Sequence, residues 1–110
     1  GRLDDGVEHL REALKLDPES AGIHSNLGLA LARQGRAAEA LRHLGRAVEL
    51  DPGNAGIRNN LGVMLVRVGH YDDAVAQFRQ ALTIDPNLRE AQMNLDDAMA
   101  RSRQGTPRSR

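Results

Sequence analysis

The sequence contains 110 residues with 15 basic and 15 acidic side chains, and 40% of its residues are hydrophobic. This length allows one domain at most, and the composition is that of a folded chain rather than a disordered one. The lack of cysteine excludes disulfide bonds and thiolate metal sites and favours a reducing, cytoplasmic location, and the lack of a long apolar run excludes a membrane-spanning helix.

The basic residues are concentrated at the C-terminal end of the chain. Residues 101–110 contain four arginines and no acidic residue, so the rest of the chain is net acidic. A nucleic-acid-binding domain is usually basic in its folded part, so we expect no nucleic-acid partner. Because Gly105 and Pro107 disfavour regular structure, we expect residues 104–110 to form a disordered basic tail.

In chain order, apolar residues at spacings of three and four predict six helices. These helices cover approximately residues 3–16, 21–34, 37–50, 55–68, 71–84 and 88–103. Gly35 and Gly69 follow the second and fourth helices, where glycine accepts the left-handed backbone of a helix end. The links are short, so neighbouring helices must be antiparallel.

The chain repeats itself with a period of 34 residues. Asp-Pro pairs occur at this spacing at residues 17–18, 51–52 and 85–86, and Asn-Leu-Gly occurs at residues 26–28 and 60–62. Proline disfavours helix at the residue before it, so each Asp-Pro pair ends a helix. Gly28 and Gly62 lie inside predicted helices, where glycine costs about 1 kcal/mol relative to alanine, so we expect a partner helix to approach closely there.

The 34-residue period, the Leu-Gly pair of the first helix, the Ala and Leu or Phe columns of the second helix and the closing proline resemble the tetratricopeptide repeat. The resemblance implies an all-α protein, an α-solenoid of antiparallel helix pairs in a right-handed superhelical stack. Two aromatic positions of the family differ here, so no binding role of those aromatics is carried over. The usual Trp is replaced by His24, Arg58 and Gln92, and the usual Tyr by Leu31, Leu65 and Met99.

The repeat alignment divides the chain into an array over residues 1–103 and the tail. Residues 1–20 match the second helix of a truncated repeat, residues 21–54 and 55–88 form full repeats, and residues 89–103 form a last first-type helix. That helix carries Asp96 in the column of Gly28 and Gly62, so we interpret it as a polar capping helix.

No catalytic motif is present in the sequence. It contains no His-x-x-x-His pair for a metal, no phosphate-binding loop and no Gly-x-Ser-x-Gly turn around a nucleophile. We therefore expect no enzyme activity, no metal site and no cofactor.

Three asparagines and three arginines recur in the first-type helices. They are Asn26, Asn60 and Asn94, and, seven residues after each, Arg33, Arg67 and Arg101. Helical periodicity puts both sets on one face of each helix, away from the Leu27 and Leu61 core, and stacking makes that face concave. Amides match the donors and acceptors of an extended peptide backbone, and arginine favours carboxylates, so we predict a peptide-binding groove.

The asparagine column resembles the asparagine ladder of the O-GlcNAc transferase-type repeat superhelix, which implies contact with a substrate polypeptide. In the alternative interpretation, these asparagines form local hydrogen bonds only.

The predicted function is therefore a protein-interaction scaffold that binds an extended protein or peptide segment. Two alternatives stay open: a substrate-recruiting arm of a larger enzyme such as a glycosyltransferase, and a self-assembling structural module. The second alternative rests on the first helix, whose apolar face we expect to be uncovered in a monomer and available for a homodimer. This face consists of Leu3, Val7, Leu10 and Leu14.

Overall fold

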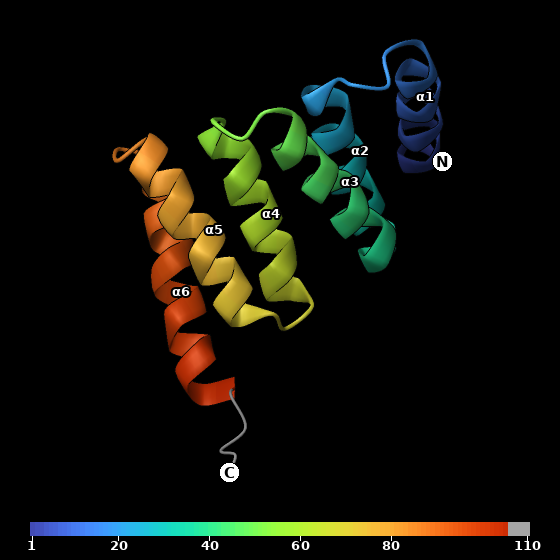
Figure 1. Ribbon diagram of the computed structural model, residues 1–110. Coiled ribbons are helices and arrows are strands. Elements are labelled where there is room, and N and C mark those ends of the chain that lie inside the picture. Colours follow the sequence, from blue (N-terminus) through green and yellow to red (C-terminus); the bar gives the residue numbers. More distant parts are fainter. Residues whose placement is uncertain (106–110) are drawn as a thin grey trace.

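The computed structural model describes residues 1–105, which form six helices and no strand (Figure 1). The helices are α1 (Arg2–Leu16), α2 (Ala21–Arg33), α3 (Ala37–Leu50), α4 (Ala55–Arg67), α5 (Tyr71–Ile84) and α6 (Arg89–Gly105). They stack into an elongated body with principal extents of 46 × 28 × 21 Å. The predicted all-α solenoid of antiparallel helix pairs is confirmed.

The helices pack in the order of the repeat. Helix α2 packs against α3, α4 against α5 and α5 against α6, while α1 packs against α2. The backbones of α2 and α4, and of α4 and α6, also approach each other, whereas in residues 1–105 those of α1, α3 and α5 do not. The array therefore curves with α2, α4 and α6 on its inner, concave side.

The predicted helix ends are set by glycine and by Asp-Pro. Gly35 and Gly69 have φ angles of +81° and +85°, which confirms the left-handed backbone expected after α2 and α4. Helices α3 and α5 end at Leu50 and Ile84, and their C-cap residues, Asp51 and Asp85, precede proline. At the other end of the first-type helices, Ser20 accepts a hydrogen bond from the backbone N–H of Ile23 at 3.2 Å, and Asn54 caps α4 in the same way.

The C-terminal helix is longer than the sequence predicted. Helix α6 continues through Gln104 and Gly105, two residues that the sequence analysis placed in a disordered tail. No proline occurs between Pro86 and Pro107, and one glycine at a helix end does not stop the last turn. Residues 106–110 of the expected tail lie outside the described residues.

The core is built where second helices press against first helices. Leu27, Leu31 and Leu44 are fully buried in the first repeat, and Phe78 is fully buried in the second. A Cβ atom on Gly28 would lie 2.7 Å from Cγ of Leu44, and a Cβ atom on Gly62 would collide with the Phe78 ring. The close helix approach predicted from these two glycines is confirmed.

The apolar face of α1, expected to be uncovered, is covered by α2 at Val7 and stays half-buried at Leu3, Leu10 and Leu14. Val7 is only 4% exposed, and Leu10 and Leu14 pack against the same core as Leu27 and Leu44. The reason is that a second helix packs on the first helix of the following repeat as well as on its own partner, and α2 supplies that contact here. Less apolar surface than expected is therefore open on this face, and a homodimer through it stays a prediction.

Candidate functional site

The three asparagines of the concave face occupy different environments. Asn26 on α2 is exposed, whereas Asn60 on α4 and Asn94 on α6 are half-buried. The side-chain amide of Asn60 donates to Ser25 Oγ at 3.2 Å, and the amide of Asn94 donates to Asn59 Oδ1 at 3.1 Å. Both bonds therefore join one repeat to the repeat before it.

Two buried polar residues receive these inter-repeat bonds. Ser25 is 4% exposed and Asn59 is 3% exposed, and each precedes an asparagine of the predicted ladder by one position. Sequence reasoning missed them, although polar residues one period apart were a usable signal. Asn60 and Asn94 thus bond across repeats rather than locally, while the side chain of Asn26 forms no hydrogen bond within residues 1–105.

The amides border a hollow of about 330 Å³ on the concave side of α2, α4 and the start of α6, which we call the amide hollow. Its lining includes Asn26, Asn60 and the backbone of Gly22 and Gly56, with Glu90 at the α6 side. Because glycine has no side chain, the backbone itself forms the surface of the hollow at these two positions. The amide hollow offers amide donors and acceptors to a backbone laid across the helices.

A second hollow of about 160 Å³, the arginine hollow, adjoins the first through Asn60. Arg33 and Arg67 stand at its edges, both exposed. Its floor and walls are apolar and consist of Leu29, Ala32, Val63 and Met64. The two arginines were predicted from the sequence, but this apolar floor was not.

The third predicted arginine lies elsewhere. Arg101 borders a separate hollow of about 440 Å³ with Tyr71 and Asp97, and its Nε lies 3.0 Å from Asp97 Oδ2. The hydrogen bond with Asp97, with a smaller contribution from Tyr71, raises the pKa of Arg101. Asn94, too, is outside the lining of the amide and arginine hollows. The structure therefore brings together Asn26, Asn60, Arg33 and Arg67, and separates Arg101 from them.

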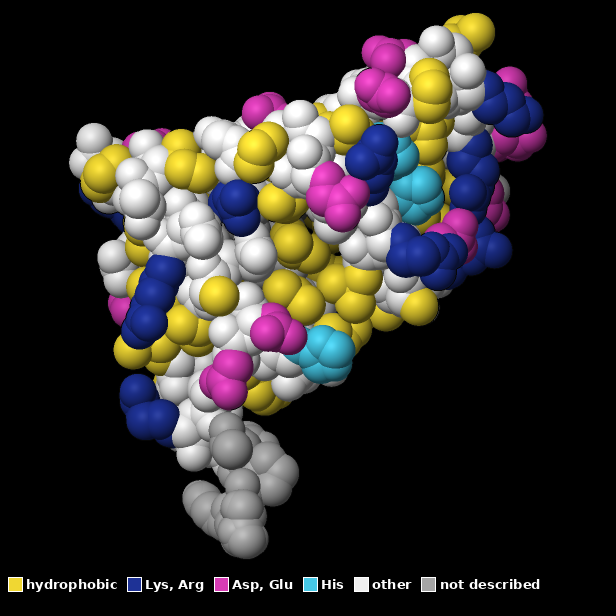
Figure 2. Space-filling model, viewed as in Figure 1, with side chains coloured by type: hydrophobic (Ala, Val, Ile, Leu, Met, Phe, Trp, Pro, Cys, Tyr) yellow, Lys and Arg dark blue, Asp and Glu magenta, His cyan; other side chains and the backbone are white. Residues whose placement is uncertain are grey.

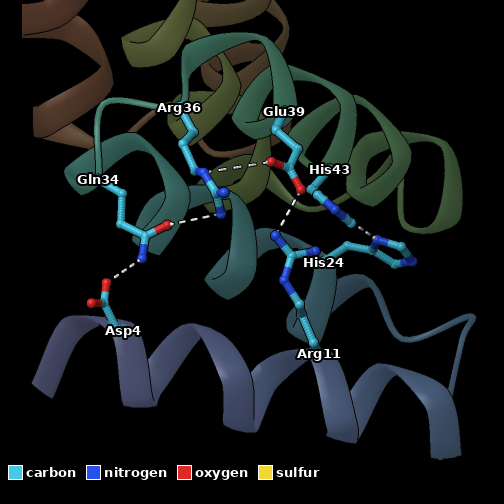
Figure 3. A network of polar contacts seen from close by, with 7 residues as sticks. All are labelled: Asp4, Arg11, His24, Gln34, Arg36, Glu39 and His43. Carbon is cyan, nitrogen blue, oxygen red and sulfur yellow. Dashed lines mark hydrogen bonds and ion pairs between the residues drawn. The ribbon is translucent and has the colours of Figure 1, made fainter. Parts of the chain in front are cut away.

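The family's usual Trp position carries polar side chains with one repeated geometry. His24 Nε2 donates to the Pro18 carbonyl oxygen at 2.9 Å, and its Nδ1 lies 3.1 Å from Nδ1 of His43 on α3 (Figure 3). One repeat later, Arg58 Nε donates to the Pro52 carbonyl oxygen at 2.8 Å, and Nη1 donates to Gln77 Oε1 at 3.1 Å. Both pairs tie the first helix to the second helix and to the preceding turn.

A network of charged residues joins α1 to the first full repeat beside the histidines. Arg11 donates to Glu39 at 2.7 Å, and Gln34 donates to Asp4 at 2.7 Å (Figure 3). Figure 2 shows charged side chains gathered over this end of the molecule, next to histidine. The hydrogen bond from Arg11 lowers the pKa of Glu39, and burial, with smaller effects of His24 and Arg11, lowers the pKa of His43.

Within residues 1–105, no group of three His, Cys, Asp or Glu side chains is placed to hold a metal ion. In the same residues, no helix is long and apolar enough to span a membrane.

The fold and the concave polar face define a helical-repeat protein of the solenoid class. A family model described as "Tetratricopeptide repeat" matches residues 19–87, and a "TPR repeat" model matches residues 1–35. The chain belongs to the tetratricopeptide-repeat family. No curated protein matches it.

Three solved structures of different proteins share this fold. The chain is 29% identical to an O-GlcNAc transferase of Thermobaculum terrenum, with a TM-score of 0.84 over 90% of this chain and 19% of that one. It is 26% identical to MamA protein, with a TM-score of 0.83 over 91% of this chain and 55% of that one. The first TPR of Spaghetti (RPAP3) bound to an HSP90 peptide is 20% identical, with a TM-score of 0.86 over 91% and 79%. The chain thus spans about half of MamA and about a fifth of the transferase.

Proposed function

We propose that this protein is a protein-interaction scaffold that holds an extended segment of another protein on the concave face of α2, α4 and α6. The observation that carries the proposal is the continuity of the amide hollow and the arginine hollow through Asn60. Further support comes from the Spaghetti domain, which shares the fold and carries an HSP90 peptide. The ligand backbone lies across the helices and its side chains alternate between the two hollows and solvent.

The hydrogen bonds that the concave face offers are expected to give only modest affinity for a peptide. A net hydrogen bond contributes about 0.5–1.5 kcal/mol, and association costs at least about 4 kcal/mol in lost rigid-body freedom. Asn60 and Asn94 each already use one of their two amide N–H donors between repeats, so the other N–H and the carbonyl oxygen of each, together with the whole amide of Asn26, serve a ligand. A ligand therefore needs side-chain contacts in addition to backbone contacts.

A second function is favoured by one specific comparison. The chain is 29% identical over 90% of its length to part of an O-GlcNAc transferase chain. The same concave face suits a substrate-recruiting arm of a larger enzyme, in which the repeat array binds the polypeptide and the chemistry takes place in another domain.

The scaffold function is tested by selecting binders from a random peptide library displayed on phage and measuring them by fluorescence anisotropy. The variant is Asn26→Ala, because Asn26 has no structural hydrogen bond within residues 1–105, and the control is Asn87→Ala in the exposed α5–α6 turn. Loss of one amide contact is expected to weaken the selected peptides about threefold to tenfold in Asn26→Ala only. Equal affinities for both variants would contradict binding on the concave face.

A further inference from the structure

The three arginines of the ladder differ in what lies one helical turn before them. Arg101 pairs with Asp97, four residues earlier on α6, at 3.0 Å. In the same column of the repeat, Leu29 precedes Arg33 and Val63 precedes Arg67. One arginine of this column is therefore neutralised by a carboxylate four residues before it. The other two arginines have an apolar residue at that position.

The two unneutralised arginines lie one repeat apart on α2 and α4. Both are exposed, and neither forms an ion pair with any acidic side chain of residues 1–105. Leu29 and Val63, which replace the carboxylate, instead line the arginine hollow between them. The hollow, at about 160 Å³, has room for one aliphatic side chain with a cation on each side of it.

We propose that the arginine hollow selects a segment in which an apolar residue is flanked by acidic residues at alternate positions. The apolar side chain enters the hollow over Leu29 and Val63, and the carboxylates pair with Arg33 and Arg67. Alternate positions are required because every second side chain of an extended peptide points to the same face. This inference rests on the proposed function and specifies the ligand class.

Charge restricts the acidic part of the ligand to this end of the face. The amide hollow on the other side of Asn60 carries Glu90 and no basic side chain in its lining. A carboxylate placed there would meet a like charge and no cation, which is unfavourable. The ligand is therefore acidic and apolar over the arginine hollow and neutral or basic over the amide hollow.

The test uses fluorescein-labelled peptides with identical flanks and one of three centres: Glu-Ser-Leu-Ser-Glu, Gln-Ser-Leu-Ser-Gln and Glu-Ser-Ser-Ser-Glu. Binding to the wild-type chain is measured by anisotropy at low and at high salt. The first peptide is expected to bind roughly tenfold more tightly than either of the others, with an advantage over the glutamine peptide that shrinks as salt screens the charges. Equal binding of the glutamate and glutamine peptides would overturn the proposal.

A single substitution tests the internal comparison with Arg101. Leu29→Asp places a carboxylate four residues before Arg33, as Asp97 is placed before Arg101, and Leu29→Asn has similar size and polarity without the charge. Leu29→Asp is expected to lose the part of the preference for the glutamate over the glutamine peptide that Arg33 supplies, while Arg67 keeps its part, whereas Leu29→Asn keeps the whole preference. Loss of the preference in both variants, or in neither, contradicts the proposed pairing of Arg33 with a ligand carboxylate.

A second pair of variants keeps the proposal testable if Leu29→Asp does not fold, as judged by circular dichroism. Arg33→Gln with Arg67→Gln removes both cations, and Arg42→Gln with Arg79→Gln removes two exposed arginines of the second helices. Only the first pair is expected to abolish the glutamate preference. If library-selected peptides depend on Asn26 but show no acidic preference, this inference fails and the scaffold function stands; if no peptide depends on Asn26, the scaffold function itself fails.

Discussion

At the scale of single residues, His24 and Arg58, six residues after Pro18 and Pro52, are two chemical solutions to one geometry. His24 and Arg58 both donate to the carbonyl oxygen of the preceding proline and both contact the facing second helix. The histidine solution is sensitive to pH, because the contact between the two rings needs one bare Nδ1 and one Nδ1–H, and protonation of both rings would leave two donors facing each other. The arginine solution carries a charge that does not titrate in the physiological range.

We predict that acid destabilises the first repeat. Burial, His24, Arg11 and Arg42 hold the pKa of His43 below its ordinary value of 6.5, and Glu39 only partly opposes them. A histidine with a lowered pKa is protonated in the unfolded chain first, so its stabilising contribution is present above pH 6.5 and is lost as the pH falls below it. Glu39, whose pKa is also lowered, contributes a loss only below 4.5.

The measurement is urea unfolding at a series of pH values between about 8 and 5. The matched variant is His24→Arg with His43→Gln, which copies the Arg58–Gln77 pair of the second repeat into the first. This variant is expected to have a flatter dependence of unfolding free energy on pH. Parallel curves for the variant and the wild-type chain would show that the histidine pair is not the source.

We predict opposite effects of alanine at two helical glycines. Gly62→Ala forces a Cβ atom against the Phe78 ring, so overpacking is expected to exceed the propensity gain and to destabilise the protein by about 1–3 kcal/mol. Gly45→Ala in α3 meets nothing within 4 Å and is expected to stabilise it by about 0.5–1 kcal/mol. Urea midpoints provide the comparison, and a destabilising Gly45→Ala would remove the packing explanation.

At the scale of helices, the N-terminal helix is attached differently from the others. Helix α1 packs on α2 through Val7, Leu10 and Leu14, and two polar bridges join it to the turn after α2 and to α3. Helix α1 is less buried than α3 at equivalent repeat positions. Gly6, Leu10 and Ala13 are half-buried, whereas the equivalent residues of α3 are fully buried; these are Ala40, Leu44 and Ala47. Among the second helices α1, α3 and α5, α1 therefore has the fewest buried residues.

We predict that α1 opens before the rest of the array, and that this opening depends on Val7. Val7→Ala removes buried methyl groups beneath α1, so hydrogen exchange in residues 2–16 is expected to accelerate roughly tenfold while exchange in α4 and α5 stays unchanged. The control is Leu16→Ala, because Leu16 is 89% exposed. Equal acceleration across all helices would mean that α1 is part of one cooperative unit.

Local signals predicted the helices well and the contacts between repeats poorly. Gly35, Gly69 and the Asp-Pro pairs act on their own backbone, so they could be read directly from the sequence. The end of α6 was missed because Gly105 was interpreted as a breaker although it only closes the last turn. The bond of Asn60 to Ser25 spans 35 residues and depends on the rotation of α4 against α2, which no local pattern specifies.

The arginine ladder shows how a repeat can mislead. The Arg101–Asp97 pair was visible as an acid four residues before an arginine, but the regular spacing of Arg33, Arg67 and Arg101 favoured one shared role. The apolar floor of the arginine hollow was hidden for a different reason: Leu29 and Val63 lie outside the main core stripe and count as ordinary surface residues until α2 and α4 are placed side by side.

At the scale of the whole molecule, stacking produces a surface that no single repeat possesses. Each hollow of the candidate site needs residues from two consecutive first helices, and Asn60 belongs to both hollows. Asn60 on α4 donates to Ser25 on α2 and lines both hollows, so this one amide both holds the two helices in register and borders the site. We propose that a partner segment binds on this concave face.

The most direct test is a titration of the isotope-labelled 12.0 kDa chain with the Glu-Ser-Leu-Ser-Glu peptide, followed by two-dimensional amide correlation spectra. We predict that the largest shift changes map to the concave sides of α2 and α4, around Asn26, Arg33, Asn60 and Arg67, with small changes in α3 and α5. Changes concentrated on the outer helices α3 and α5, or at the junction of α1 with α3, would show that the concave face is not the binding surface.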